Sequence, residues 1–195
     1  MLVRIAVAIM VCAIAAPAVL RSQNRPIDLE RSTLTVFVYK SGLFSVLADD
    51  HVIRAPLAGG MISEDSPLGV GISVHSAGLV VLDPGLSVEK RADVQARMLG
   101  PEVLDSARFP DIEFASTAIE RLRADAWNVS GRVTIHGVTR SARFEVARQD
   151  GHYRGSTLVK LRDFRIEPIS IAGGTVKVKD ELKIEFDIVP AERSR

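Results

Sequence analysis

Apolar and polar residues alternate along most of the chain after Ser22. A period of two residues is typical of β-strands that bury one side and expose the other. Four segments follow this pattern clearly: residues 33–39, 111–116, 127–135 and 142–147. Turn-forming residues separate such segments, among them Asp83-Pro84-Gly85, His136-Gly137, Asp150-Gly151 and Gly173-Gly174. The pattern therefore predicts an all-β protein with antiparallel strands.

The longest alternating segment lies near the C-terminus and spans residues 175–188. Its length, roughly 46 Å at about 3.3 Å per residue, is typical of a strongly coiled sheet. Asp180 is the one polar residue on its apolar side. An unpartnered carboxylate there would cost several kcal/mol. We therefore consider three roles for Asp180: a hydrogen-bonded clasp that fixes strand register, a contact with a ligand headgroup, or a bulge exposed to solvent. The candidate partners are Arg140, Arg162 and His51.

One segment has helical rather than strand periodicity. Ser87 is a suitable N-cap for a helix over residues 87–99, because a serine oxygen accepts a hydrogen bond from the first helical turn. Gly100-Pro101 ends this helix. We expect about eight strands around one short helical crossover. Since closure removes free sheet edges, this strand number predicts an extended eight-stranded antiparallel barrel.

The first 18 residues differ from the rest of the chain. Arg4 precedes an uninterrupted apolar run over residues 5–15, which is too short to span a bilayer. Small residues follow as Ala16-Pro17-Ala18. These features predict a signal peptide over residues 1–18, cleaved after Ala18, and export of the barrel domain over residues 19–195. Cleavage would also remove Cys12, the only cysteine, so the mature protein would form no disulfide.

The charge balance argues against nucleic acid as a partner. The chain has 25 Lys and Arg against 24 Asp and Glu, a formal net charge of +1. Nucleic-acid binding depends on an excess of cations facing phosphates. The aromatic residues, 5% of the chain, are also too few for a base-stacking surface.

Few residues are arranged for catalysis or metal binding. The sequence has no G-x-S-x-G motif and no glycine-rich phosphate loop before a helix. Asp49 and His51 would point the same way on a strand, but a zinc site needs a third and usually a fourth ligand. We therefore expect no catalytic residue, no cofactor and no metal ion. The alternative is a periplasmic enzyme or metal-binding protein that uses the corner formed by Asp49 and His51.

Three segments resemble the motifs of a known family. Residues 103–117 contain Leu-Asp followed by Phe-Pro-Asp-Ile-Glu-Phe-Ala-Ser, residues 129–140 contain Thr-Ile-His-Gly-Val-Thr, and Asp163-Phe164-Arg165-Ile166 precedes the Val-Lys-Asp-Glu-Leu of residues 178–182. In this order they are similar to the polyisoprenoid-binding YceI-like family. Two positions depart from its pattern. Arg165 stands where the family usually has glycine, and Asp49-Asp50-His51 stands where one branch has His-x-His.

The resemblance implies a lipocalin-like barrel that is exported to the periplasm and sequesters a long-chain isoprenoid or similar amphiphilic lipid in its lumen. The sequence leaves a transient membrane contact open, and it defines neither the headgroup nor the oligomeric state. Gly131, a small inward residue, is where a larger side chain would block the lumen. The alternation supplies the apolar wall: Leu34, Val36, Val38, Ile112, Phe114, Trp127, Val129, Gly131, Val133, Phe144, Leu182, Ile184 and Phe186.

Overall fold

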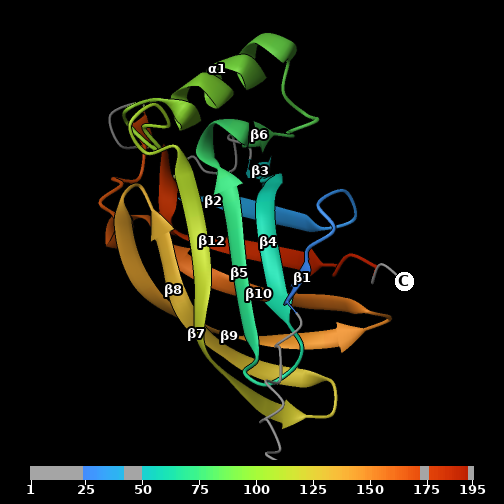
Figure 1. Cartoon of the computed structure of the whole chain (residues 1–195). Helices are drawn as coiled ribbons and strands as arrows, with labels where there is room; N and C mark the ends of the chain where they lie inside the picture. The colour runs from blue at the N-terminus through green and yellow to red at the C-terminus, as the bar shows by residue number, and fades with distance from the viewer. Residues whose placement is uncertain (1–23, 42–49, 172–175, 193–195) are drawn as a thin grey trace, which may run out of the picture.

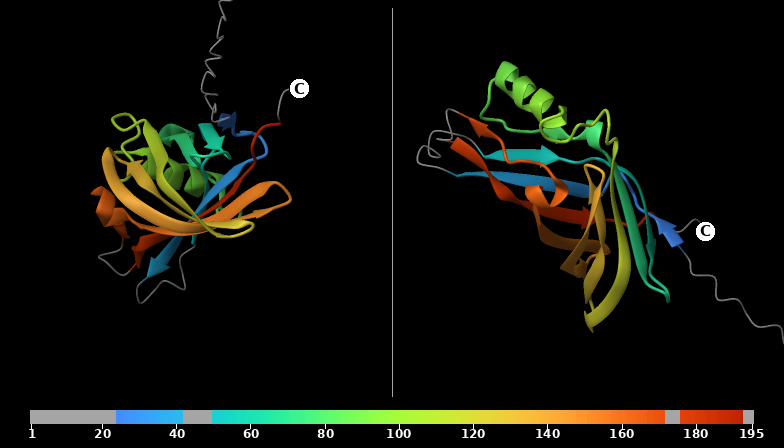
Figure 2. Two further views of the ribbon diagram at one scale, coloured as in Figure 1. Left: turned by 60° about the horizontal axis from the view of Figure 1, so that its bottom comes forward. Right: turned by 90° about the vertical axis from the view of Figure 1, so that its left-hand side faces the viewer.

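The computed structural model describes residues 24–41, 50–171 and 176–192. The expected signal peptide and Asp49 therefore lie outside the described residues. Twelve strands form one antiparallel sheet, which curls into a half-barrel (Figures 1 and 2). The strands are β1 (Asn24–Pro26), β2 (Thr33–Ser41), β3 (His51–Arg54), β4 (Leu57–Ser63), β5 (Gly69–His75), β6 (Val80–Val81), β7 (Asp111–Arg123), β8 (Ala126–Ile135), β9 (Val138–Gln149), β10 (His152–Lys160), β11 (Ser170–Ile171) and β12 (Val176–Ile188).

The helical elements are one α-helix, α1 (Val88–Leu99), and two short 3-10 helices, η2 (Ser76–Gly78) and η3 (Leu161–Phe164). The strands lie in the order β1-β4-β5-β7-β8-β9-β10-β12-β2-β3-β6, and β11 pairs with β12. None of the helices in the described ranges is long and apolar enough to cross a membrane.

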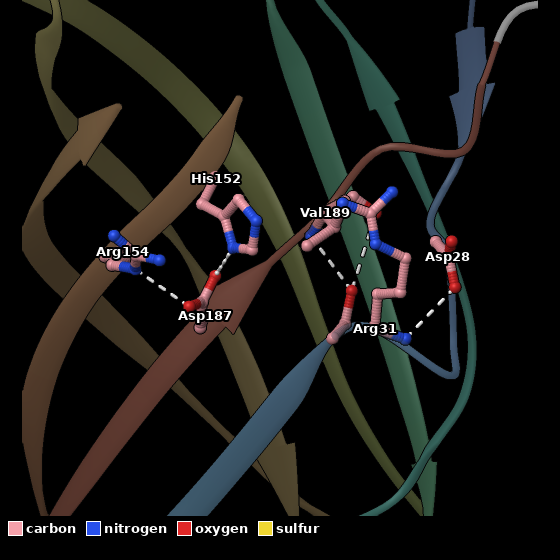
Figure 3. Close-up of polar contacts among 7 residues, drawn as sticks. Asp28, Arg31, His152, Arg154, Asp187 and Val189 are labelled. Carbon is pink, nitrogen blue, oxygen red and sulfur yellow. Dashed lines mark hydrogen bonds and ion pairs between the residues drawn. The ribbon is translucent and has the colours of Figure 1, made fainter. Parts of the chain in front are cut away.

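The all-β antiparallel class is confirmed, but the expected count of eight strands in a closed barrel is wrong. Local backbone interruptions divide the chain into more and shorter strands. A turn at Asp28 separates β1 from β2. The Asp28 side chain accepts hydrogen bonds from the backbone N–H groups of Glu30 and Arg31, both at 3.1 Å, and Figure 3 shows the bond to Arg31. Pro56, which has no N–H to donate, lies between β3 and β4. The two-residue strands β6 and β11 add further pairings.

The region from β7 to β10 is more regular. Two of its three two-residue turns have positive φ: 51° and 69° at His136 and Gly137, and 53° and 80° at Asp150 and Gly151. Such turns match the right-handed twist of the strands that they join. The turn residues that the sequence indicates therefore connect β8 to β9 and β9 to β10 directly.

The helix prediction is confirmed. The Ser87 side chain accepts a hydrogen bond from the backbone N–H of Lys90 at 3.3 Å, and Gly100 caps the C-terminal end. Gln95 fastens α1 to the sheet, because its side chain accepts from the N–H of Val81 at 2.8 Å and donates to the carbonyl of Leu79 at 2.6 Å. The helix lies over one end of the half-barrel (Figure 1).

Strand β12 corrects the expectation of one evenly alternating strand. Its register against β2 shifts between Val178 and Leu182, so Asp180 lies in a bulge rather than in the apolar row. The Asp180 carboxylate accepts a hydrogen bond from the backbone N–H of Arg162 at 2.9 Å. Its partner is thus the main chain of η3, not a cationic side chain.

Arg165 forms a left-handed turn at the position where the family usually has glycine. It follows η3 in the left-handed conformation, with φ 61° and ψ 29°. The N–H of the next residue, Ile166, donates to the carbonyl of Leu161 at 3.1 Å. A residue with a Cβ is strained in this conformation. The turn therefore forms here at an energetic cost that glycine would avoid.

Candidate functional site

An apolar cavity of about 740 Å³ opens on the concave side of the sheet. It is bordered by α1 at one end, which we name the helix end. At the other end lie the turns that join β4 to β5, β7 to β8 and β9 to β10, and we name this the hairpin end. All of the wall residues expected from the alternation border the cavity, except Gly131. Their part in ligand binding remains a prediction.

Gly131 lies beneath the ring of Phe114 and does not border the cavity. A Cβ atom there would lie 2.5 Å from Cε2 of Phe114 and 2.6 Å from the carbonyl oxygen of Ala115. The Phe114 ring therefore fills the space above Gly131, and β7 and β8 approach closely. The expectation that a leucine at position 131 would block the lumen without disturbing the strand is wrong, because its Cβ would clash with the backbone.

Three phenylalanine rings form a row across the concave face. The centroid of Phe144 lies 5.3 Å from that of Phe114 and 5.4 Å from that of Phe186. Phe186 covers Gly155 as Phe114 covers Gly131, since a Cβ on Gly155 would lie 2.5 Å from Cζ of Phe186. Such rings supply a large apolar surface with few rotatable bonds. All three border the cavity.

At the helix end, His51 borders the cavity and pairs with a buried carboxylate. Its Nδ1 lies 2.5 Å from Oδ2 of Asp83, which is 4% exposed. Oδ1 of Asp83 accepts the backbone N–H of Val52 at 2.8 Å. This pair orients the imidazole and ties β3 to the segment leading into α1. Within the described ranges, no group of three His, Cys, Asp or Glu side chains could hold a metal ion.

At the hairpin end, polar side chains from three strands or their turns meet beside the cavity. Oε1 of Glu64 accepts a hydrogen bond from the Tyr153 hydroxyl at 2.7 Å, and Oε2 pairs with Arg25 at 2.6 Å. Arg25 also donates to the carbonyl of Ala191 at 2.6 Å. These contacts join β1, β10 and the turn after β4 across the open side of the sheet.

The contacts at Glu64 change the proton affinity of two groups. Burial raises the pKa of Glu64, but hydrogen bonds from Tyr153 and Arg25, with the nearby charge of Arg148, hold it below its ordinary value. Burial and the Glu64 carboxylate raise the pKa of Tyr153 to about 12. Near neutral pH the cluster therefore contains a carboxylate and a neutral phenol.

The other polar candidates lie away from this cavity. Arg140 donates to the carbonyl of Thr139 at 3.1 Å, and Arg162 pairs with Glu167 at 3.2 Å. Neither arginine, nor Asp180, is among the described residues that border the cavity. Of the four polar candidates, only Asp180 and Arg162 are brought together, through the backbone N–H of Arg162, and only His51 reaches the cavity wall.

A separate polar cluster lies on the outward side of β10 and β12. Asp187 accepts hydrogen bonds from His152 at 2.7 Å and from Arg154 at 2.8 Å (Figure 3). Burial raises the pKa of Asp187, but these hydrogen bonds outweigh it and hold the pKa below its ordinary value. The row on β12 that alternates with the apolar wall therefore stabilises strand pairing from the convex side.

Several cavity residues were missed in the sequence because they are polar or lie outside the clearest alternation. Tyr153 follows the turn Asp150-Gly151, and Glu64 follows β4. Two arginines, Arg121 and Arg148, also border the cavity. Extending the inward row of β9 two residues past Val146 would have found Arg148. Arg121 could not be found in this way, because the register of β7 against β8 shifts between Ser116 and Ala118 and brings the odd-numbered residues inward.

Comparisons with known proteins agree with this architecture. The crystal structure of Burkholderia cenocepacia BcnA superposes with a TM-score of 0.66 at 17% identity, covering 85% of this chain and 99% of that chain. A polyisoprenoid binding domain from Saccharophagus degradans, implicated in plant cell wall breakdown, gives a TM-score of 0.57 at 14% identity, covering 84% of this chain and 95% of that one. No curated protein sequence matches. The model of the YceI-like domain matches residues 64–190. The chain, matched over more than half its length, belongs to the YceI-like family.

Proposed function

We propose that this protein is an exported carrier that sequesters a long-chain isoprenoid or similar amphiphilic lipid in the cavity of the half-barrel. The observation that carries the proposal is a cavity of about 740 Å³ with an almost continuous apolar wall. The fold is shared with a domain described as polyisoprenoid binding. Export to the periplasm rests on the signal-peptide features of residues 1–18.

The size of the cavity suits a slender chain. If each non-hydrogen atom takes roughly 30 Å³, the share of one water molecule in the liquid, the cavity accommodates roughly 25 atoms. That corresponds to about five isoprene units. Burying about 300 Å² of such a chain would contribute roughly 7 kcal/mol before association costs. Apolar contact alone therefore supplies useful affinity.

A pair of matched substitutions on β9 tests the proposal. Ala142 borders the cavity, whereas Ala147 is exposed and points outward from the same strand. Ala142→Phe should fill part of the cavity, and Ala147→Phe should leave it unchanged. We expect wild-type protein purified from its own membrane-containing extract to carry a lipid of several hundred daltons by native mass spectrometry. Occupancy should fall severalfold in Ala142→Phe only.

Two outcomes would contradict the proposal. One is wild-type protein that carries no lipid and does not bind a C20 isoprenoid alcohol in solution. The other is equal lipid occupancy in the two alanine variants, because that would place the bound lipid outside the cavity. Thermal melting of both variants checks that the added ring has not unfolded the protein.

A further inference from the structure

The two ends of the cavity differ in the charge they present. At the helix end, α1 contributes side chains of both signs, Lys90, Asp93 and Arg97, and Arg97 pairs with Glu102 at 3.0 Å. At the hairpin end, the bordering charges are Arg121, Arg148 and Glu64. Arg25 already pairs with Glu64. The hairpin end therefore has an excess of positive charge from two arginines.

Strand register places both arginines on the concave side. Arg121 lies directly opposite Trp127, and Trp127 lies opposite Val146. Arg148 lies opposite Tyr153 and two residues beyond Val146 on β9. Residues directly opposite one another in an antiparallel pair project to the same face. The two arginines thus continue the inward rows at the point where the apolar wall ends.

Aromatic rings position both guanidinium groups. Cζ of Arg121 lies 5.7 Å from the centroid of the Trp127 ring, and Cζ of Arg148 lies 5.7 Å from that of Tyr153. The two rings are themselves 5.8 Å apart. An arginine over an aromatic face keeps its N–H donors available to a planar or tetrahedral oxyanion. The arrangement brings two such groups to one end of an apolar cavity.

Neighbouring arginines are engaged differently. Arg123 pairs with Glu145 at 3.0 Å, and Arg143 pairs with Glu120 at 3.3 Å, both on exposed surface. Within the described part of the chain, the guanidinium groups of Arg121 and Arg148 make neither a hydrogen bond nor an ion pair with a carboxylate, although the charge of Arg148 also helps to lower the pKa of Glu64. Their excess charge beside an apolar volume favours an amphiphile with an anionic group.

We infer that Arg121 and Arg148 bind the phosphate or other oxyanion headgroup of the ligand, so that its hydrocarbon chain runs from the hairpin end toward α1. This inference rests on the proposed function and adds the headgroup class and the direction of binding. The row of Phe114, Phe144 and Phe186 then contacts the chain. A neutral headgroup would gain apolar contacts but not the two charge-assisted contacts.

The test compares two ligands that share a C20 chain: geranylgeraniol and geranylgeranyl monophosphate. Binding to the lipid-free protein is followed by the fluorescence of Trp127, the only tryptophan, and by calorimetry. We expect the wild type to bind the monophosphate at least tenfold more tightly than the alcohol. Each charge-assisted contact is typically worth about a factor of ten.

Variants that remove or keep the two charges test whether Arg121 and Arg148 cause the preference for the monophosphate over the alcohol. Arg121→Gln/Arg148→Gln should bind both ligands within about threefold of each other, with affinity for the alcohol unchanged. Arg121→Lys/Arg148→Lys should keep part of the preference. The matched control Arg123→Gln/Arg143→Gln removes two charges from the exposed pairs and should retain the wild-type preference. The alcohol affinity of each variant reports whether its cavity is intact.

The outcomes separate the inference from the proposed function. If the wild type binds the alcohol and the monophosphate equally, the headgroup inference is overturned and the carrier function stands. If it binds neither, the carrier function fails. Loss of alcohol affinity in the glutamine variant would show that the arginines shape the cavity wall instead. Inorganic phosphate that binds as tightly as the monophosphate would indicate a free-anion site, which also overturns the inference.

Discussion

The helix end and the hairpin end of the cavity are held in place by different kinds of contact. At the helix end, side chains bind the backbone of short strands, as Gln95 binds β6 and Asp83 binds Val52 in β3. At the hairpin end, long strands and two-residue turns set the positions of Arg121 and Arg148 through register. Register distributes stability over many ladder bonds, whereas each side-chain anchor acts alone. Single substitutions should therefore cost more at the helix end.

The largest effect is expected from Asp83→Ala. It leaves His51 and the N–H of Val52 without their carboxylate partner in a buried setting. Unsatisfied buried groups typically cost 1–3 kcal/mol each, so we expect a loss of about 3 kcal/mol in the free energy of unfolding. In a domain of this size the melting temperature should fall by about 6–12 °C.

Asp65→Ala is the control for this substitution, because Asp65 is exposed in the turn between β4 and β5 at the hairpin end. Chemical denaturation of both variants measures the difference. Equal losses would mean that the Asp83 contacts do not anchor the helix end.

A smaller effect is expected at the hairpin end from Tyr153→Phe. It removes the hydroxyl that donates to Glu64, but Arg25 stays paired with the same carboxylate and the strand ladder stays intact. We expect a loss of about 1 kcal/mol in urea denaturation. A loss as large as that of Asp83→Ala would contradict the contrast between the two ends.

Tyr153 also makes the stability of the hairpin end depend on pH in the alkaline range. Its pKa is raised to about 12 in the folded protein, against about 10 in an unfolded chain. The neutral phenol is therefore favoured by folding, and its contribution to stability is complete below pH 10 and is lost as pH rises toward 12. In Tyr39→Phe, where Tyr153 is the only remaining tyrosine, the absorbance titration should have its midpoint at about 12. A midpoint near 10 would show that the phenol is not bonded to Glu64.

The smallest effect is a gain of stability from Arg165→Gly beside the helix end. Glycine avoids the left-handed strain at φ 61° but has a more flexible unfolded chain, so the net gain should be about 0.5 kcal/mol. Arg165→Ala keeps the strain and removes the charge. Calorimetry should show stabilisation in the glycine variant only; equal gains would assign the effect to charge.

The sequence predicts the wall and the turns of the cavity but not the polar contacts at its two ends. Alternation identifies the wall from Leu34 to Phe186, and the turns at His136 and Asp150 follow from local residue preference. The contact of Glu64 with Tyr153 joins residues 89 positions apart, which no local pattern encodes. The same holds for the His51 and Asp83 pair. An apolar criterion also ends the inward row of β9 at Val146, just before Arg148, and the bulge after Ser116 hides Arg121 from the alternation of β7.

The strand breaks were beyond the pattern for another reason, and the bulge at Asp180 was one of three alternatives that the pattern left open. Asp28 interrupts a strand by accepting local hydrogen bonds, and Pro56 does so because it has no N–H to donate; both leave the hydrophobic alternation on either side intact. At Asp180 the alternation continues by residue type while the register shifts, because a bulge changes the pairing without changing the sequence pattern. Counting alternating segments therefore understates the number of strands.

The aromatic row limits how this cavity could be reshaped. At both Gly131 and Gly155 an added Cβ atom would lie 2.6 Å from a backbone oxygen of the neighbouring strand, so neither position can accept a side chain. Phe114 and Phe186 have no such constraint from the backbone of the glycines they cover. Cavity volume at the aromatic row can be adjusted by replacing the rings on β7 and β12, but not by adding side chains at the two glycines of β8 and β10. Divergence in ligand size at this row, natural or engineered, is thus directed to the rings and not to the glycines that they cover.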